Sequence, residues 1–572
     1  MRIELVDSIP RLPDKKNPPS DSSSRRRMAM PVLIALVFLI AGVFLVFHVQ
    51  LLSGFRYMQP DSSDPRHVNY VLERNHQWFQ GSRPNEGFWS PPFCYPWQNI
   101  GTQTDSMLGM QPFFSLWRIA GVSTETSYQL CSMSLLVGCF IAAWIFLRRG
   151  FSFGALAAAV GAFVFAFASP RSAQIGHIML FAHYATPLAV LGLVLEFRDS
   201  RLDPRRWQWI WLFFVGLVVQ LYSSIYLTWF LLLLLVLALA IALLLPPARS
   251  ALIDSLGCKS RVWVAAAAFA GLASLPLITP YLRASRVLPG SSFAQVFVLL
   301  PQPESFLFAG YGNWIGNFTG LNQWQPIATL QYIWEQGLSP GFVTTILALA
   351  GLWIQRRKPF TQVCVGTAAI ALLLMMRWPG GFTLWKWVFE VLPGANAIRG
   401  ISRVVLLLLL IASYGVASTF AFMTKKWGVL PAVALALIVA LEQGQTQMRY
   451  EKDEPRIRSM TIAQTIPEDC EVFFYTGLIG GPQEIVNNQL DAMWAGLITG
   501  IPTVNGYTSY QPPGWWEAVD GAMDFSPEPD ALPNLAASLF RAGVTASSLC
   551  VVRIQFEGSR AVNSEVLSVP IS

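Results

Sequence analysis

Long uninterrupted blocks of apolar residues constrain this chain more than any other feature. The first block covers residues 28–49, and ten more are centred near residues 135, 159, 188, 214, 235, 268, 347, 370, 408 and 435. A membrane-spanning helix needs about 20 mostly apolar residues. Of the 572 residues, 53% are hydrophobic and only 13% are charged, whereas soluble chains carry about a quarter charged residues. The pattern excludes a disordered chain and an ordinary cytosolic enzyme, and it predicts a polytopic α-helical membrane protein of about 11 transmembrane helices.

Basic residues predict the orientation of these helices. Threading the blocks alternately through a bilayer places every basic cluster on one side: Arg25–Arg27, Arg148 and Arg149, residues 198–206, residues 249–261, Arg356–Lys358, and Lys425 with Lys426. Short cytoplasmic loops are enriched in Lys and Arg. We therefore expect the N-terminus inside and the C-terminus outside. The first block is too long for a signal peptide and lacks a small-residue cleavage site, so we interpret it as a retained anchor.

Three parts of the chain follow from this topology. Residues 1–27 form a cytoplasmic N-terminal tail, and residues 28–444 form the transmembrane domain, with large extracytoplasmic loops at 51–130 and 281–340. Residues 445–572 are expected to form a small C-terminal α+β extracytoplasmic domain, with strands near 471–475 and 550–555 and a helix near 530–542. Cys470 and Cys550 both fall in this outer domain, where a disulfide between them is chemically allowed.

The net charge of +7 does not indicate a nucleic-acid partner. The basic residues form no continuous stripe along the sequence. They lie instead at the ends of the apolar blocks, as expected for membrane topology. The seven cysteines show no CxxC or Cys/His spacing, so no metal site is assigned.

The first outside loop carries the acidic residues that could do chemistry, namely Asp61, Asp64, Glu73 and Asp105. Asp64 and Asp105 each stand where a helix would begin, so either could serve only as a helix cap. A carboxylate at the mouth of a membrane domain could instead act as a general base or bind a divalent metal ion. The residues alone leave both interpretations open.

Several runs of sequence resemble a known family. They are Asp64-Pro-Arg66 with Tyr70-Val-Leu-Glu73, Phe88-Trp-Ser-Pro-Pro, Asp105 with Leu108-Gly109, residues 395–403, residues 490–494 and residues 502–513. In layout and motifs the chain resembles bacterial integral-membrane glycosyltransferases of the GT-C type, including the YfhO-like group. The resemblance implies a bacterial cytoplasmic (inner) membrane protein, a polyprenyl-phosphate-linked sugar as donor, and a glycan, lipid or protein acceptor.

The resemblance also implies a catalytic carboxylate in the first outside loop. Carried over by position, this is Asp64, with Asp61, Glu73 and Asp105 as alternatives. The chain departs from relatives that hold a compact acidic pair here, since two serines separate Asp61 from Asp64. No cofactor is assigned, and a divalent metal is left open.

Cationic and imidazole side chains complete the expected substrate site. A leaving lipid phosphate needs fixed positive charge, and an Arg guanidinium offers a bidentate fork. Arg399 and Arg403 precede a late span at its outer edge, where they could also be ordinary interfacial residues, and Arg66 is a further candidate. His177 and His183 lie near the outer ends of the third and fourth spans, where substrate contact and structural hydrogen bonding are both open.

Three classes of function remain to be weighed. The resemblance favours a membrane glycosyltransferase that uses a loop carboxylate as base. The alternative is a membrane transporter or lipid flippase, against which the spans show few charges and no obvious broken-helix pair. The outer domain could also be a non-catalytic binding module. The sequence has no DxD pair, which disfavours nucleotide-sugar donors.

Overall fold

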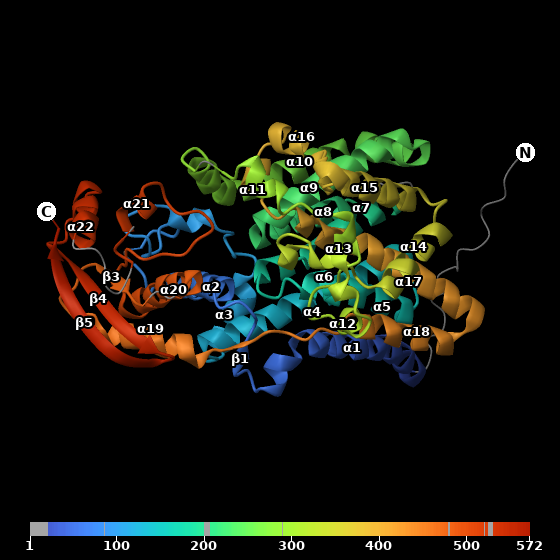
Figure 1. The fold of residues 1–572 in the computed structure, drawn as a ribbon. Coiled ribbons are helices and arrows are strands. Elements are labelled where there is room, and N and C mark those ends of the chain that lie inside the picture. Colours follow the sequence, from blue (N-terminus) through green and yellow to red (C-terminus); the bar gives the residue numbers. More distant parts are fainter. Residues whose placement is uncertain are drawn as a thin grey trace, which may run out of the picture.

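The computed structural model describes residues 21–84, 86–199, 206–288, 290–478, 481–519, 521–523 and 530–571. Most of the predicted cytoplasmic tail, and Arg201 and Arg205 of one basic cluster, lie outside the described residues. Figure 1 shows a large helical part and, beside it, a smaller α+β part that contains the C-terminus.

Apolar helices coincide with all the predicted blocks. They are α1 (Asp21–Leu52), α4 (Thr124–Phe151), α5 (Ala155–Phe167), α7 (Ala185–Asp199), α8 (Gln208–Ser223), α9 (Ile225–Leu244), α10 (Pro246–Ala284), α14 (Phe342–Ile354), α15 (Pro359–Met375), α17 (Val405–Trp427) and α18 (Val429–Glu442). The chain is a multi-pass membrane protein.

Fewer helices than expected are long enough to cross a bilayer alone. Within the described residues, seven are long and apolar enough, or up to eight if a bent pair is one span. The bent pair joins α15 to residues 379–391 at 82°, a broken arrangement that the sequence did not reveal. The helices α8, α14 and α18 are apolar but shorter. By helix length alone, the described residues therefore contain fewer membrane-spanning helices than the eleven predicted.

Small residues let the membrane helices pack closely. A Cβ atom at Gly351 of α14 would lie 1.7 Å from the backbone oxygen of Gly415 in α17, and one at Gly161 of α5 would lie 2.8 Å from the oxygen of Ser413. Membrane helix interfaces rely on such close approach, because lipid supplies no hydrophobic drive between helices. The helices α5, α14 and α17 thus form a tight centre.

The α+β part confirms the predicted strands and helix and adds one strand. It contains α19 (Asp453–Thr465), α20 (Pro482–Thr499), α21 (Trp515–Val519) and α22 (Ala531–Arg541) with β3 (Phe473–Thr476), β4 (Ser548–Glu557) and β5 (Arg560–Pro570). In the sheet β4 is central, parallel to β3 and antiparallel to β5.

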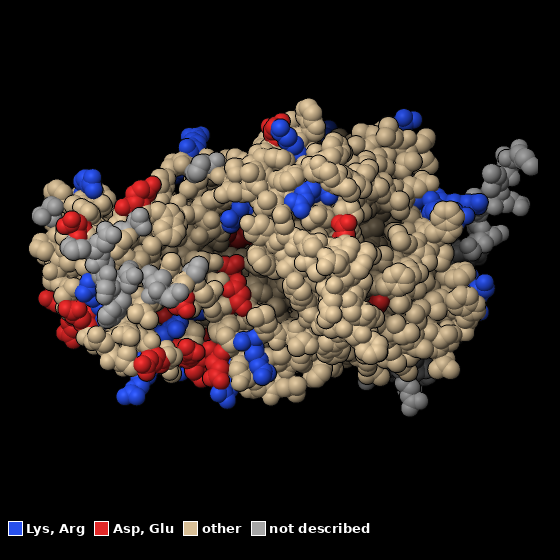
Figure 2. Space-filling model, viewed as in Figure 1, with Lys and Arg blue, Asp and Glu red and all other residues tan. Residues whose placement is uncertain are grey.

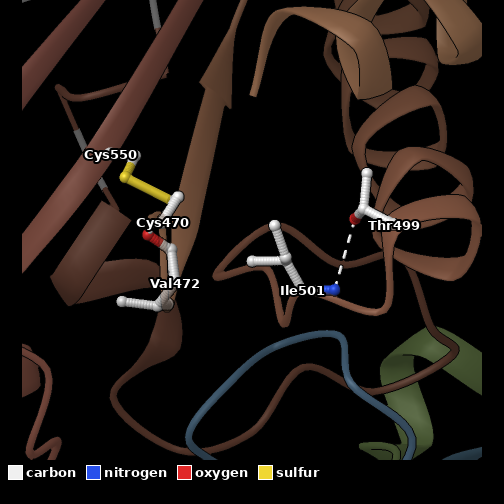
Figure 3. The surroundings of a disulfide bond; sticks show 5 residues. All are labelled: Cys470, Val472, Thr499, Ile501 and Cys550. Carbon is white, nitrogen blue, oxygen red and sulfur yellow. Dashed lines mark hydrogen bonds between the residues drawn. A yellow bond between two sulfur atoms is a disulfide. The ribbon is translucent and has the colours of Figure 1, made fainter. Parts of the chain in front are cut away.

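A disulfide joins Cys470 to Cys550, with the two Cα atoms 6.1 Å apart. Figure 3 shows this bond beside Val472, whose backbone oxygen lies 3.1 Å from Sγ of Cys470. The bond thus ties the turn before β3 to β4, within the sheet.

The first outside segment packs into the same body as the C-terminal residues. Its elements are β1 (Tyr57–Met58), α2 (Asp64–Phe79), η1 (Ile100–Gln103) and α3 (Gln111–Ile119). The strand β1 pairs with β2 (Tyr450–Glu451), and Tyr70 and Phe93 share one buried cluster with Phe474 and Trp515. The outer part of the molecule is therefore built from two distant stretches of chain, whereas the sequence suggested that residues 445–572 fold alone.

Short elements complete the connections. They are α6 (Ser169–Ser172), η2 (Ile178–Phe181), α11 (Phe293–Phe297), η3 (Pro303–Phe306), α12 (Trp314–Phe318), η4 (Leu321–Gln323), α13 (Gln325–Ala328), η5 (Ile333–Glu335), η6 (Pro379–Gly381), α16 (Trp385–Val391), η7 (Ala395–Ala397) and η8 (Ile401–Val404).

Candidate functional site

Asp64 stands at the start of α2, where its carboxylate accepts hydrogen bonds from two side chains. The Nε2 atom of His177 lies 2.9 Å from Oδ2, and the hydroxyl of Tyr507 donates to Oδ1 over 2.7 Å. Pro65 follows at the first turn, where proline is favoured and a negative charge meets the positive end of the helix dipole. Among the described residues the carboxylate is not used as a backbone cap of α2. Capping therefore does not account for Asp64.

The electrostatics of Asp64 favour the charged form. Burial raises the pKa of Asp64, but the bonds and charge of His177 and the bond from Tyr507 lower it more, so its pKa lies well below the usual range. The side chain keeps 31% of its surface exposed. Asp64 is thus an ionised, reachable acceptor of protons.

Tyr507 reaches Asp64 because a neighbouring asparagine anchors its loop to β3. The Asn505 amide accepts from the backbone N–H of Tyr475 over 2.7 Å and donates to the oxygen of Tyr475 over 3.0 Å. The next residue is Gly506, where a Cβ atom would lie 2.0 Å from Sγ of Cys94. Only glycine fits this approach of the C-terminal loop to the first outside segment.

Arg403 forms the second charged pair of the site. Its guanidinium donates to Glu335 over 2.6 Å and 3.2 Å and lies over the ring of Tyr226. Burial raises the pKa of Glu335, but the charge and hydrogen bond of Arg403 lower this pKa by more than burial raises it. The charge of His177 lowers it as well, so the net shift of the pKa is downward. The pair is two-pronged and largely buried, which fixes the direction of the guanidinium.

The two pairs belong to one electrostatic unit. His177 acts on Glu335, and Asp64 acts on Arg403, although Asp64 and Arg403 come from opposite ends of the membrane domain in sequence. Figure 2 shows the surface hollowed between the α+β part and the membrane helices, with acidic and basic atoms inside the hollow. The structure thus brings Asp64 and His177 into contact, and the charges of these two residues act on the pair of Arg403 and Glu335.

Arg399 lies at the rim beside a second tyrosine of the C-terminal loop. Its guanidinium carbon is 5.5 Å from the centroid of the Tyr510 ring, and the Tyr510 hydroxyl is 2.8 Å from Oγ of Ser291. Arg399 is exposed, and no described acidic residue forms an ion pair with it. It is therefore a cation available to a ligand, whereas the guanidinium of Arg403 already binds Glu335.

The other predicted residues have partners of their own. Glu73 is bound by Arg118 at 2.8 Å and 3.1 Å. Arg66 pairs with Asp491 of α20 at 2.5 Å. These buried contacts join α2 to α3 and to α20, and they favour structural roles.

Asp105 serves as an external cap of α9. It accepts from Ser224 Oγ over 2.8 Å and from the backbone N–H of Ile225 over 3.0 Å. Burial raises the pKa of Asp105, against the opposing effect of these bonds and of Arg403. Asp105 thus lies near Arg403 but has a structural role as a helix cap.

Asp61 and His183 have contrasting surroundings. Asp61 accepts from the backbone N–H of Ser63 over 2.9 Å, in a loop that packs against Gly176, next to His177. His183 is fully buried, with its ring 6.3 Å from that of Phe165, and neither ring nitrogen has a partner among the described residues. Asp61 therefore borders the site, and His183 is buried beside Phe165 and near Arg171.

Sequence reasoning missed His67, Glu335 and Tyr507. Burial lowers the pKa of His67 to about 4, against the opposing charge of Asp64, so His67 is neutral beside the carboxylate. Its position three residues after Asp64, on the same helix face, was a usable signal. Tyr507 lies in residues 502–513, one of the runs that carry the family resemblance, but its partner Asp64 is distant in sequence. Glu335 had no motif around it. In the described part of the chain no group of three or more His, Cys, Asp or Glu residues could hold a metal ion.

Comparison with known proteins shows similarity in fold. No family model matches the sequence, and no curated protein resembles it in sequence. Arabinofuranosyltransferase AftD from Mycobacteria matches 92% of this chain with a TM-score of 0.55 and 16% identity. The chain therefore has a fold similar to that of AftD, which is a GT-C glycosyltransferase. This chain spans 35% of the AftD chain.

One smaller GT-C enzyme matches over the full length of both chains. ArnT from Cupriavidus metallidurans, solved with undecaprenyl phosphate bound, matches 95% of this chain and 98% of its own, with a TM-score of 0.47 and 12% identity. Because this TM-score is below 0.5, the match does not support an assignment of the fold, which rests on the similarity to AftD.

Proposed function

We propose that this protein is a membrane glycosyltransferase that moves a sugar from a polyprenyl-phosphate carrier to a glycan, lipid or protein acceptor outside the cytoplasm. The observation that carries the proposal is the ionised Asp64 carboxylate, held by His177 and Tyr507 at the mouth of a GT-C fold. The polyprenyl carrier is inferred from the motifs in the sequence.

The chemistry assigns Asp64 the role of general base. The acceptor hydroxyl attacks the anomeric carbon of the donor sugar, and its proton passes to the Asp64 carboxylate. The bond between that carbon and the phosphate oxygen breaks, and its electron pair leaves with the polyprenyl phosphate. The carboxylate is unprotonated at neutral pH, as a base must be, while its lowered pKa makes it a weak base.

Arginine side chains stabilise the charge on the leaving phosphate. Arg399 is exposed and has no carboxylate to neutralise it, so it is our candidate for direct contact with the phosphate. Arg403 contributes positive charge from a fixed position in its pair with Glu335. His177 orients Asp64.

The membrane arrangement is part of the same proposal. Eleven spans, counting α8, α14, α18 and the bent pair, put residues 445–572 on the outer face together with Asp64. The bacterial inner membrane and the YfhO-like group follow from the sequence resemblance. No metal is needed in this scheme.

Purified protein in nanodiscs tests the proposal. A panel of polyprenyl-phosphate sugars is supplied with crude cell-envelope acceptors, and release of polyprenyl phosphate is measured. We expect release by the unaltered protein and a loss of about 10²–10⁴-fold in Asp64→Asn. The matched control is Asp453→Asn, an exposed carboxylate of α19 that only approaches Arg456. Equal rates in Asp64→Asn and the control would contradict the assignment of the base, and substrate movement without release would favour a transporter.

A further inference from the structure

The outside segment 305–334 has an unusual composition for a loop beyond the membrane. It contains no Lys, Arg, Asp or Glu, whereas residues 51–123, on the same side, contain ten. Large apolar side chains nevertheless project from it: Leu307, Tyr311, Trp314, Ile315, Phe318, Leu321, Trp324, Tyr332 and Trp334. Phe318 is 91% exposed. A water-facing loop would not gather such a surface.

The segment lies over the outer ends of two helices that are too short to span the bilayer. The 13 residues of α14 and the 14 of α18 rise about 20 Å at 1.5 Å per residue. The hydrocarbon core is about 30 Å thick. About 10 Å of the core is therefore not covered by either helix.

Specific contacts fasten the segment to this place. The amide of Asn313 donates to the oxygen of Glu442 over 2.8 Å, and the backbone N–H of Trp314 donates to Gly444 over 3.0 Å. The Trp314 ring lies 6.4 Å from the ring of His48 in α1. The segment is thus attached to the outer ends of α1 and α18, as Figure 1 shows for α12.

Asparagine side chains satisfy backbone groups within the segment. Asn317 donates to the oxygen of Tyr311 over 2.9 Å, Asn313 accepts from the N–H of Gly316 over 2.8 Å, and Asn322 donates to Asn317 over 2.8 Å. Irregular backbone at membrane depth is tolerated only when its polar groups have partners in the protein. Asn313, Asn317 and Asn322 thus bind backbone groups of Gly316, Tyr311 and Gly310 without charged side chains.

We propose that residues 305–334 form a lipid-facing surface at the outer boundary of the hydrocarbon core, next to the headgroups, where it completes the short spans α14 and α18. The occupant of this surface is phospholipid. Trp and Tyr concentrate at this depth of the bilayer, and Figure 2 shows the face around α12 and α13 as largely uncharged. Because η5 begins inside the segment and ends at Glu335, the surface also holds Glu335, and with it Arg403, at headgroup level. The inference is independent of the proposed transferase activity.

Spin labels in nanodiscs of phosphatidylcholine test the proposal. The exposed or half-buried thiols are first removed by Cys258→Ser and Cys364→Ala. Labels are then attached at Phe318→Cys, at Trp334→Cys and, as a control on the exposed face of β5, at Val562→Cys. We measure collision with oxygen, which enters lipid, and with a water-soluble nickel chelate.

We expect the oxygen-to-nickel ratio at residues 318 and 334 to exceed that at residue 562 several-fold. A ratio equal to that of the control would overturn the proposal, because the segment would face water. Dipolar broadening that disappears on dilution with unlabelled protein would also overturn it, because a second copy would cover the surface. Phe318 packs against little, so its replacement leaves the test intact even if Trp334→Cys fails to fold.

Discussion

The carboxylate of Asp64 lies 2.9 Å from Nε2 of His177, and this contact joins the outer α+β body to the membrane helices. Asp64 begins α2, which packs into the outer core, while His177 lies in the connection between the spans that contain α5 and α7. A displacement of either part would break the contact. The position of the candidate base therefore depends on how the two parts of the fold are held together.

Removing the hydroxyl of Tyr507 should move the acid limb of the pH profile of kcat/KM to higher pH. In the native protein the pKa of Asp64 is lowered from 3.8, so its carboxylate stays ionised. The stability that this carboxylate contributes is therefore present above pH 3.8 and is lost as the pH falls through the lowered pKa. Tyr507→Phe removes a hydrogen bond to a charged group, worth about 1.5–3 kcal/mol, so the pKa of Asp64 should rise by about one unit or more.

The pH profile of kcat/KM checks this prediction, with Tyr510→Phe as the control because its hydroxyl bonds Ser291 instead. The limb should move to higher pH only in Tyr507→Phe. A limb that stays in place would show that Tyr507 does not act on the base.

Replacing Glu73 should cost stability without abolishing chemistry. Its carboxylate is buried and bound twice by Arg118, which is about a quarter exposed. Breaking a buried pair costs about 3–5 kcal/mol, and the exposure of Arg118 reduces this to about 1–3 kcal/mol. Glu73→Gln should lower the unfolding temperature, with the remaining folded protein still active. A thousandfold loss of specific activity at unchanged stability would instead make Glu73 the base.

Asp491 should be essential for holding α2 in place. It is 1% exposed and pairs with both Arg66 and Arg458. Asp491→Asn leaves the buried Arg66 guanidinium without a charged partner and leaves Arg458 with only its longer contact to Glu454, so it should destabilise the outer body by about 3 kcal/mol or more. Glu565→Gln, on an exposed pair with Arg553, should change stability by less than about 1 kcal/mol. Chemical denaturation measures both, and equal effects would contradict the prediction.

Arg399 should govern donor binding more than turnover. A charge-assisted bond to phosphate is worth about 1.5–3 kcal/mol, so Arg399→Gln should raise KM for the polyprenyl-phosphate donor by about tenfold. Arg286→Gln, at another exposed outer arginine, should leave KM unchanged. Steady-state kinetics distinguish the two variants, and an unchanged KM in Arg399→Gln would remove Arg399 from the donor site.

The disulfide between Cys470 and Cys550 should stabilise the outer body. It closes a loop across a sequence separation of 80, for which chain entropy predicts about 4 kcal/mol. The double variant Cys470→Ala, Cys550→Ala should unfold at lower temperature and lose the sensitivity to dithiothreitol that the unaltered protein shows. No response to dithiothreitol in the unaltered protein would be evidence against this contribution.

The fold was more predictable from the sequence than the site. Apolar length and basic clusters locate membrane helices because lipid imposes a simple rule on both. The two-residue turn at Gly558 and Ser559, between two runs rich in β-branched residues, could have revealed the hairpin of β4 and β5.

The partners of the site residues were hidden for a physical reason. Asp64 could be singled out by its place after the first span, but Tyr507 is 443 residues away, and Glu335 stands in a loop without a motif. Such pairs form only when tertiary packing excludes water and brings the groups together. The residues next to each group in the sequence therefore do not reveal which distant side chain it will contact.

A structure of the protein with undecaprenyl phosphate bound would test the central claim most directly. Our account predicts that the phosphate contacts Arg399, with the Asp64 carboxylate facing the phosphate oxygen that carries the sugar in the donor. A phosphate bound on another face of the molecule, with no open path to Asp64, would contradict it.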